Sequence, residues 1–219
     1  MHTATSDYCR RAGFGAIVLL AGLRALAAAA ADTPPDVLVK TVTQEVLGII
    51  AQDKELQAGD RQKAIALVEE KMLPHFNFAR MTALAVSTNW DKSSPEQKKQ
   101  LIEEFKNLLV RTYASSITAY WDKRFDYRPL RASPADTDVT VNVRVLQPGT
   151  QAVQIEYDME KTPAGWKVWD VRIGGISLVI NYRTEFANVT RDSGIDGLIR
   201  SLVAKNKSLE RAAGEAGKK

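Results

Sequence analysis

The apolar residues of this chain change their spacing part-way along the sequence. Before about residue 120 they recur every three or four positions, which is the period of a helix with one buried face. From Val139 onward they recur at every second position, which is the period of a strand with one buried face. A run of helices followed by a run of strands is typical of an α+β fold.

The helical half carries clear start signals. Thr33-Pro34-Pro35-Asp36 supplies a cap, a first-turn proline and an acidic residue, and an amphipathic helix is expected after it. Shorter helices are expected near 64–72 and 76–86. Ser94-Pro95-Glu96-Gln97 is a capping box that opens the longest predicted helix. The apolar stripe of that helix comprises Leu101, Phe105, Leu108, Leu109, Tyr113, Ile117 and Tyr120.

The second half predicts an antiparallel sheet. Two alternating runs, 139–145 and 153–159, flank the turn at Gln147-Pro148-Gly149-Thr150. Another strand is expected at 166–173, and an edge strand at 125–131 because Pro129 lies within it. Each strand has one apolar face, so the helices should pack on one face of a curved, meandering sheet.

These patterns predict a single domain over residues 32–209. We expect its helical part at 34–122, its sheet part at 123–180 and its C-terminal helices at 181–209. Residues 210–219 are polar and small, and we expect them to form an unpacked tail.

Residues 1–31 resemble a secretory signal. Arg10 and Arg11 precede an apolar run at 12–23, and small residues at 27–31 offer cleavage sites. The run is shorter than the roughly 20 residues that span a bilayer. Removing the signal takes away three arginines and one aspartate, which halves the net charge of +4, and it takes away the one cysteine. An exported protein without a clustered basic patch is expected to bind no nucleic acid.

The chain has few residues with which to build a catalytic or metal site. One cysteine and two histidines are too few for a zinc site or a disulfide framework, and no phosphate-binding loop follows residue 31. His75 could serve as the base of a serine nucleophile, but the sequence has no G-x-S-x-G elbow to carry that serine. His75 is therefore interpreted as a helix-end or surface residue. Asp170 lies in an otherwise apolar strand and has two interpretations. It is either a structural carboxylate or, with Tyr157, the acid-base group of an isomerase-like enzyme.

The remaining feature is apolar surface, which permits two further interpretations. The apolar face of the sheet and the helix stripes can close into a filled core, as in a scaffold or interaction module. They can also leave a cleft that binds apolar ligands. We expect no catalytic residue, no metal ligand and no cofactor.

Two groups of motifs go beyond apolar spacing. The C-terminal motifs are Trp166 with Trp169-Asp170, Gly175-Ile176-Ser177-Leu178-Val179 and Ser193-Gly194-Ile195-Asp196-Gly197-Leu198. The helical motifs are Phe76-Asn77-Phe78-Ala79-Arg80-Met81, the Trp90 loop and the Phe105–Tyr113 segment. Together these motifs resemble those of the MlaC, or toluene-tolerance, family of periplasmic phospholipid-binding proteins, over roughly residues 35–205. We expect Gly174 and Gly175 to permit a bend rather than to touch lipid.

The resemblance implies a nuclear-transport-factor-like, cone-shaped sheet against a helical subdomain, enclosing a pocket for the acyl tails of a glycerophospholipid. It implies a monomeric periplasmic carrier whose cargo is phospholipid. Its partners would be an outer-membrane lipoprotein–porin complex and an inner-membrane ABC transporter complex with a periplasmic substrate-binding subunit. Moving lipid between them would maintain outer-membrane lipid asymmetry.

The pocket lining is expected on the apolar sheet face and on the longest helix. The residues predicted to bind lipid are Phe105, Leu108, Leu109, Tyr113, Val141, Val143, Val153, Ile155, Tyr157, Trp169, Val171 and Ile173. Arg124, Arg128 and Arg183 are candidates to meet a phosphate at the rim, or else are solvated or structurally paired.

Overall fold

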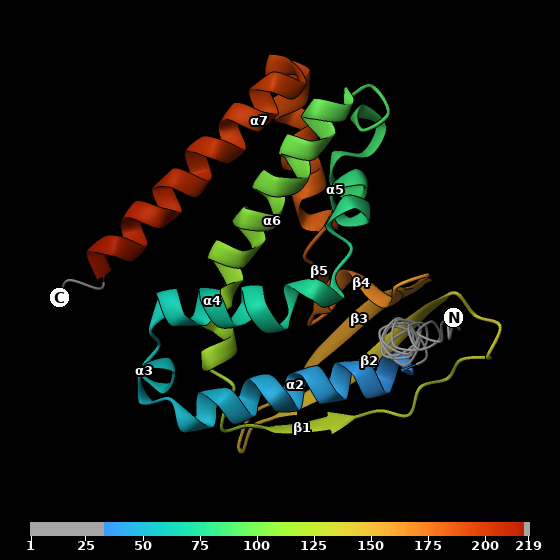
Figure 1. The fold of residues 1–219 in the computed structure, drawn as a ribbon, viewed down its shortest axis with the longest axis vertical. Helices are drawn as coiled ribbons and strands as arrows, with labels where there is room; N and C mark the ends of the chain where they lie inside the picture. The colour runs from blue at the N-terminus through green and yellow to red at the C-terminus, as the bar shows by residue number, and fades with distance from the viewer. Residues whose placement is uncertain (1–32, 217–219) are drawn as a thin grey trace, which may run out of the picture.

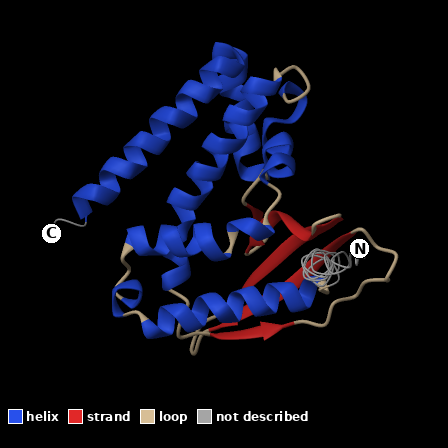
Figure 2. Ribbon diagram, viewed as in Figure 1, coloured by secondary structure: helices blue, strands red, loops and turns tan. Residues whose placement is uncertain are grey.

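A computed structural model of the protein describes residues 33–216 and confirms the α+β architecture (Figures 1 and 2). The predicted signal at 1–31 lies outside the described residues. The helices are α2 (Pro35–Gln52), α3 (Lys54–Gln57), α4 (Arg61–Lys71), α5 (Phe78–Val86), α6 (Pro95–Thr118) and α7 (Arg183–Ala216). Short 3-10 turns lie at η1 (Leu73–His75), η2 (Ser87–Asn89) and η3 (Ile180–Tyr182). Within residues 33–216, no helix is both long enough and apolar enough to cross a bilayer.

Five strands form one antiparallel meander in which each strand pairs with the next along the chain. The strands are β1 (Arg124–Tyr127), β2 (Asp138–Leu146), β3 (Val153–Thr162), β4 (Gly165–Ile173) and β5 (Ile176–Ser177). The register between β3 and β4 shifts at Asp158/Met159. Because Asp158 pairs with Asp170 and Met159 pairs with Val168, Trp169 is the extra residue of a β-bulge.

The predicted capping box opens α6 as expected. The Ser94 hydroxyl accepts a hydrogen bond from the Gln97 amide at 3.2 Å, and the Gln97 side chain accepts one from the Ser94 amide at 2.9 Å. Pro95 occupies the first turn, where its missing N–H costs no helix bond.

Helix α2 lies across the apolar face of the sheet, while α6 and α7 extend away from the sheet (Figure 1). Along α2, Val39 packs into the core of the sheet, whereas Val46 and Ile50 pack with α4 and α6. A third core joins α5, α6 and α7. Helix α2 therefore bridges the sheet layer and the helical layer.

The Phe76–Met81 motif attaches α5 to the sheet. The Asn77 side chain caps α5 and donates a hydrogen bond to the Glu160 carboxylate at 2.6 Å. The Asn77 backbone N–H donates to the Val168 carbonyl at 2.8 Å. Arg80 pairs with Glu160 at 2.7 Å and lies 4.2 Å from the centre of the Trp169 ring. This motif therefore holds the two layers together.

The C-terminal helix continues further than the sequence pattern predicts. An unpacked tail is expected at 210–219, but α7 continues to Ala216. Glu210 pairs with Arg111 of α6 at 3.2 Å, which gives this polar segment a partner. Gly194 departs from helical geometry and divides α7 at the Ser193–Leu198 motif.

Candidate functional site

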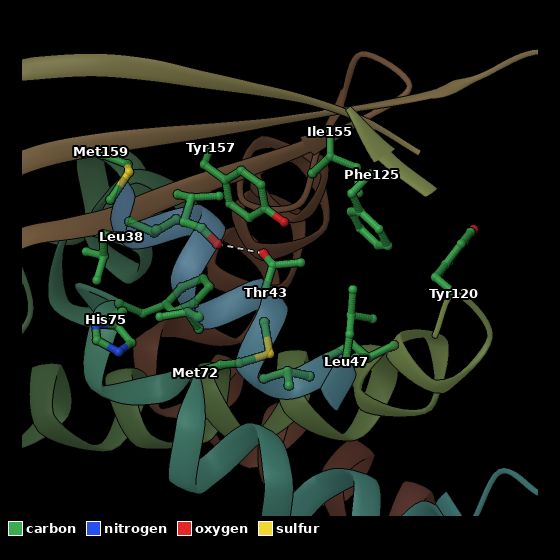
Figure 3. A pocket seen from close by; sticks show the side chains of 16 residues that line it. Leu38, Thr43, Leu47, Met72, His75, Tyr120, Phe125, Ile155, Tyr157 and Met159 are labelled. Atoms are coloured by element: carbon green, nitrogen blue, oxygen red, sulfur yellow. Dashed lines mark hydrogen bonds between the residues drawn. The ribbon is translucent and has the colours of Figure 1, made fainter. Parts of the chain in front are cut away.

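A cavity of about 130 Å³ lies between α2 and the apolar face of the sheet (Figure 3). Helix α2 contributes one wall, made by Leu38, Val39, Val42, Thr43, Val46 and Leu47. The sheet contributes the facing wall, made by Phe125, Ile155, Tyr157, Met159 and Val168. The remaining lining residues are Met72, His75, Phe76, Ile117 and Tyr120. The two walls come from segments about 80 to 130 residues apart, so tertiary packing assembles the site.

Three polar side chains of the cavity wall, Thr43, Tyr157 and His75, are neutral or favour their neutral form. Thr43 donates its hydroxyl to the Val39 carbonyl at 2.7 Å, within its own helix. Burial raises the pKa of Tyr157 to about 12, so its hydroxyl stays protonated at neutral pH. Burial, with the nearby Lys167 ammonium, lowers the pKa of His75, which favours the neutral imidazole. The cavity therefore suits an apolar, uncharged guest.

Two of the predicted sheet residues, Ile155 and Tyr157, line the cavity. Val141, Val143 and Val171 lie in the same apolar layer but are buried as core against Val39, outside the cavity wall. Val153 pairs with Val145 at the start of β3 and is also outside the wall.

The predicted face of Trp169 is wrong. Strict alternation places its ring with Val171 and Ile173, but the bulge moves Trp169 to the opposite face. There it stacks under Arg80 and borders a polar depression with Thr140, Asn142 and Asp158. Val168 takes its place in the cavity wall. Ile173 keeps the predicted face but lies beyond the wall, with 38% of its surface exposed.

The predicted lining from the longest helix belongs to a different core. Phe105, Leu108 and Leu109 are buried between α5, α6 and α7, and Tyr113 packs against the same cluster. The Phe105 ring meets those of Tyr182 and Phe186 at 5.3 and 5.2 Å. The C-terminal end of the same stripe, Ile117 and Tyr120, reaches the cavity instead. One continuous apolar stripe in the sequence therefore packs in the helical core at its start and lines the cavity at its end.

Sequence reasoning misses the contribution of α2 and of η1. The stripe containing Val39, Val42 and Val46 predicts a buried helix face but does not assign that face to the site. His75, interpreted from the sequence as a helix-end or surface residue, lies at the end of η1, and its side chain faces the cavity. The signal for α2 is apolar spacing, which marks a buried face without identifying what it faces.

The structure gives Asp170 a structural role. Its carboxylate accepts hydrogen bonds from the Ser177 hydroxyl at 2.5 Å and from the Val171 and Val179 amides at 2.8 and 3.2 Å. Asp170 pairs across the sheet with Asp158, on the face opposite Tyr157. The Asp170–Tyr157 pair of an isomerase-like site is therefore not assembled.

Two of the three arginine candidates for the rim have structural partners. The Arg128 guanidinium lies 3.6 Å from the Asp126 carboxylate, and Arg183 donates to the Leu84 carbonyl at 3.1 Å. Arg124 is exposed at the start of β1. Within residues 33–216, no group of three or more His, Cys, Asp or Glu side chains could hold a metal ion.

Two characterised proteins are similar to this chain over most of its length. The chain is 25% identical over 205 residues to the toluene tolerance protein ttg2D of Pseudomonas putida, covering 93% of this chain and 90% of that protein. It is 20% identical over 177 residues to the intermembrane phospholipid transport system binding protein MlaC of Haemophilus influenzae, covering 80% and 83%.

A solved structure and a family model agree with these relatives. The phospholipid-binding protein from Ralstonia solanacearum, solved in complex with a phospholipid, superposes with a TM-score of 0.75 at 37% identity. The match covers 81% of this chain and 99% of that one. The model of the MlaC protein family matches residues 40–204. This chain belongs to the MlaC family.

Proposed function

We propose that this protein is a periplasmic phospholipid carrier that holds the acyl tails of its cargo between α2 and the sheet. The observation that carries the proposal is the apolar cavity, whose walls contain no charged side chain other than a neutral-favoured imidazole. Support comes from the relative of 37% identity, which was solved with a phospholipid bound.

The energetics of the tails require a carrier rather than free diffusion. Two tails with about 30 methylenes, at about 0.8 kcal/mol each, favour an apolar site over water by roughly 24 kcal/mol. That value exceeds the practical ceiling for non-covalent affinity, about 18–21 kcal/mol. A membrane or another carrier already offers an apolar environment, so exchange with it is nearly neutral in free energy. Transfer must therefore occur while the protein is docked to its partner.

The cavity must also enlarge to hold its cargo. Its volume of about 130 Å³ is below the roughly 300–1,000 Å³ typical of pockets for drug-sized ligands. Helix α2 forms one whole wall and buries only Pro35, Val39, Val46 and Ile50. Displacement of α2 from the sheet is therefore the simplest way to open the site.

The same proposal includes the partners. A carrier in the periplasm would receive and deliver phospholipid at an outer-membrane lipoprotein–porin complex and at an inner-membrane ABC transporter complex. Support comes from the Haemophilus influenzae relative, which is described as a binding protein of an intermembrane phospholipid transport system. In this role the protein would contribute to outer-membrane lipid asymmetry.

Mass spectrometry of an organic extract tests the function directly. Protein purified from the periplasm without detergent should yield phospholipid in stoichiometric amount. An extract without phospholipid would assign the apolar layer to a filled core and would favour an interaction module instead.

A matched pair of variants tests the location of the site. Ile155→Arg places a charge in the cavity wall, so bound phospholipid should be lost while circular dichroism stays unchanged. Gln154→Arg, next to it but on the exposed opposite face, should keep its lipid. Equal lipid content in the two variants would show that the tails lie elsewhere.

A further inference from the structure

One row of apolar side chains crosses the whole sheet. The register pairs Tyr127 with Val143, Val143 with Ile155, Ile155 with Ile173, and Ile173 with Ile176. Residues that pair directly across antiparallel strands project from the same face. Because Ile155 lines the cavity, the whole row lies on the cavity side of the sheet.

The row becomes exposed as it leaves the cavity. Val143 is 1% exposed, whereas Ile173 and Ile176 are 38% and 64% exposed. Strands lie about 4.8 Å apart, so Ile176 is about 10 Å from Ile155. Single exposed apolar residues are common on protein surfaces, but these two continue the wall of a cavity in register. They form an apolar track from the cavity to the edge of the sheet.

The β4–β5 turn fixes these two side chains. Gly174 and Gly175 have φ of 59° and 84°. A two-residue hairpin with a type I′ turn requires such left-handed values at both positions. The turn therefore sets Ile173 beside Ile176. On the other face of the hairpin, Arg172 is paired with Glu156 at 2.9 Å. The hairpin is apolar toward the cavity side and ion-paired on the opposite side.

We propose that the acyl-chain site extends out of the cavity along the Ile155–Ile173–Ile176 row, and that a phospholipid tail lies on the exposed isoleucines. This inference rests on the proposed function. Two observations select an acyl chain as the occupant. The cavity of about 130 Å³ is too small for two tails, and the row is an unbroken apolar continuation of the cavity wall. The β4–β5 hairpin is then the side from which tails enter and leave.

Site-specific photo-cross-linking tests the proposal. A benzophenone side chain would replace Ile176, Ile155 or Val37 in separate samples of lipid-loaded protein. Val37 is the matched control because it is also exposed, at 45%, but lies at the start of α2 outside the cavity wall. After irradiation, mass spectrometry would identify adducts with phospholipid acyl chains. We expect adducts at positions 155 and 176 and none at position 37.

The other outcomes separate the two proposals. An acyl adduct at 155 without one at 176 would overturn the extended site and leave the proposed function standing. Absence of lipid from the protein would overturn both. Adducts at 176 to protein rather than to lipid, or equal acyl adducts at 176 and 37, would also overturn the extended site.

A second pair of variants gives an independent measurement. Ile176→Asp should lower by about tenfold the ratio of phospholipid retained by the protein to phospholipid taken up by acceptor vesicles at equilibrium, the effect of uncovering about two methylenes. Val37→Asp should retain phospholipid as the unsubstituted protein does. Equal retention by the two variants would contradict the proposal, and unchanged circular dichroism would show that both are folded.

Discussion

At the scale of single residues, His75 gives the protein a pH-dependent stability. Burial and the neighbouring Lys167, whose ammonium donates to the Pro74 carbonyl at 2.6 Å, lower the pKa of His75 in the folded state. The unfolded chain therefore binds more protons below about pH 6.5, and the free energy of unfolding falls as the pH falls through this range.

We expect this dependence to disappear in His75→Gln. Urea unfolding between pH 7.5 and 5.5 should show a slope of at most about 1.4 kcal/mol per pH unit in the unsubstituted protein. The variant should show a nearly flat profile over the same range. A slope that persists in the variant would assign the effect to another group.

Asp170 supplies the second prediction at this scale. Asp170→Ala removes the acceptor for the Ser177 hydroxyl and for two amides in a site where Asp170 is 3% exposed. Buried donors left without partners should lower the free energy of unfolding by about 2–5 kcal/mol in urea unfolding. Asp170→Asn keeps one acceptor oxygen and should lower the free energy of unfolding by less. Equal, small losses in the two variants would contradict this role.

At the scale of elements, the corner within α7 depends on close packing. A Cβ at Gly197 would lie 2.3 Å from the Ser193 Cβ, and Asp196 anchors the corner by accepting from Gln97 of α6 at 2.7 Å. The Ser193–Leu198 motif, which carries part of the family resemblance, thus shapes a turn between helices.

Gly197→Ala should therefore lower the free energy of unfolding by about 1–3 kcal/mol. Gly214→Ala, in the same helix, should instead raise it by about 0.5–1 kcal/mol, because a Cβ added there would meet nothing within 4 Å. Urea unfolding of both variants provides the comparison. A loss in both would point to the helix backbone rather than to the corner.

The bulge in β4 shows where prediction from sequence fails at this scale. Both Val168 and Trp169 are apolar, so inserting one residue leaves the apolar pattern of 166–173 nearly unchanged. The inserted residue nevertheless reverses the faces of Trp166 and Val168 relative to Val171. Pairing with β3 decides the face, and pairing is a tertiary property.

At the scale of the whole molecule, α2 should be the part that moves when lipid binds. It buries four residues, whereas α6 buries seven. Hydrogen exchange followed by mass spectrometry should show faster exchange of α2 amides after delipidation and no change in the middle of α6. Equal protection of α2 with and without lipid would mean that the cavity opens by another movement.

The amino-acid sequence was sufficient to specify the α+β class, the order of the main helices and strands, the α6 capping box, a glycine bend after β4 and the family. These depend on local spacing and on backbone geometry, which neighbouring residues specify. Packing in three dimensions was needed to show that Phe105 and Leu108 belong to a helical core while Ile117 lines the cavity. An apolar side chain follows the same periodicity whether it meets another side chain or an open cavity, so the site became visible only once α2 and the sheet were brought together.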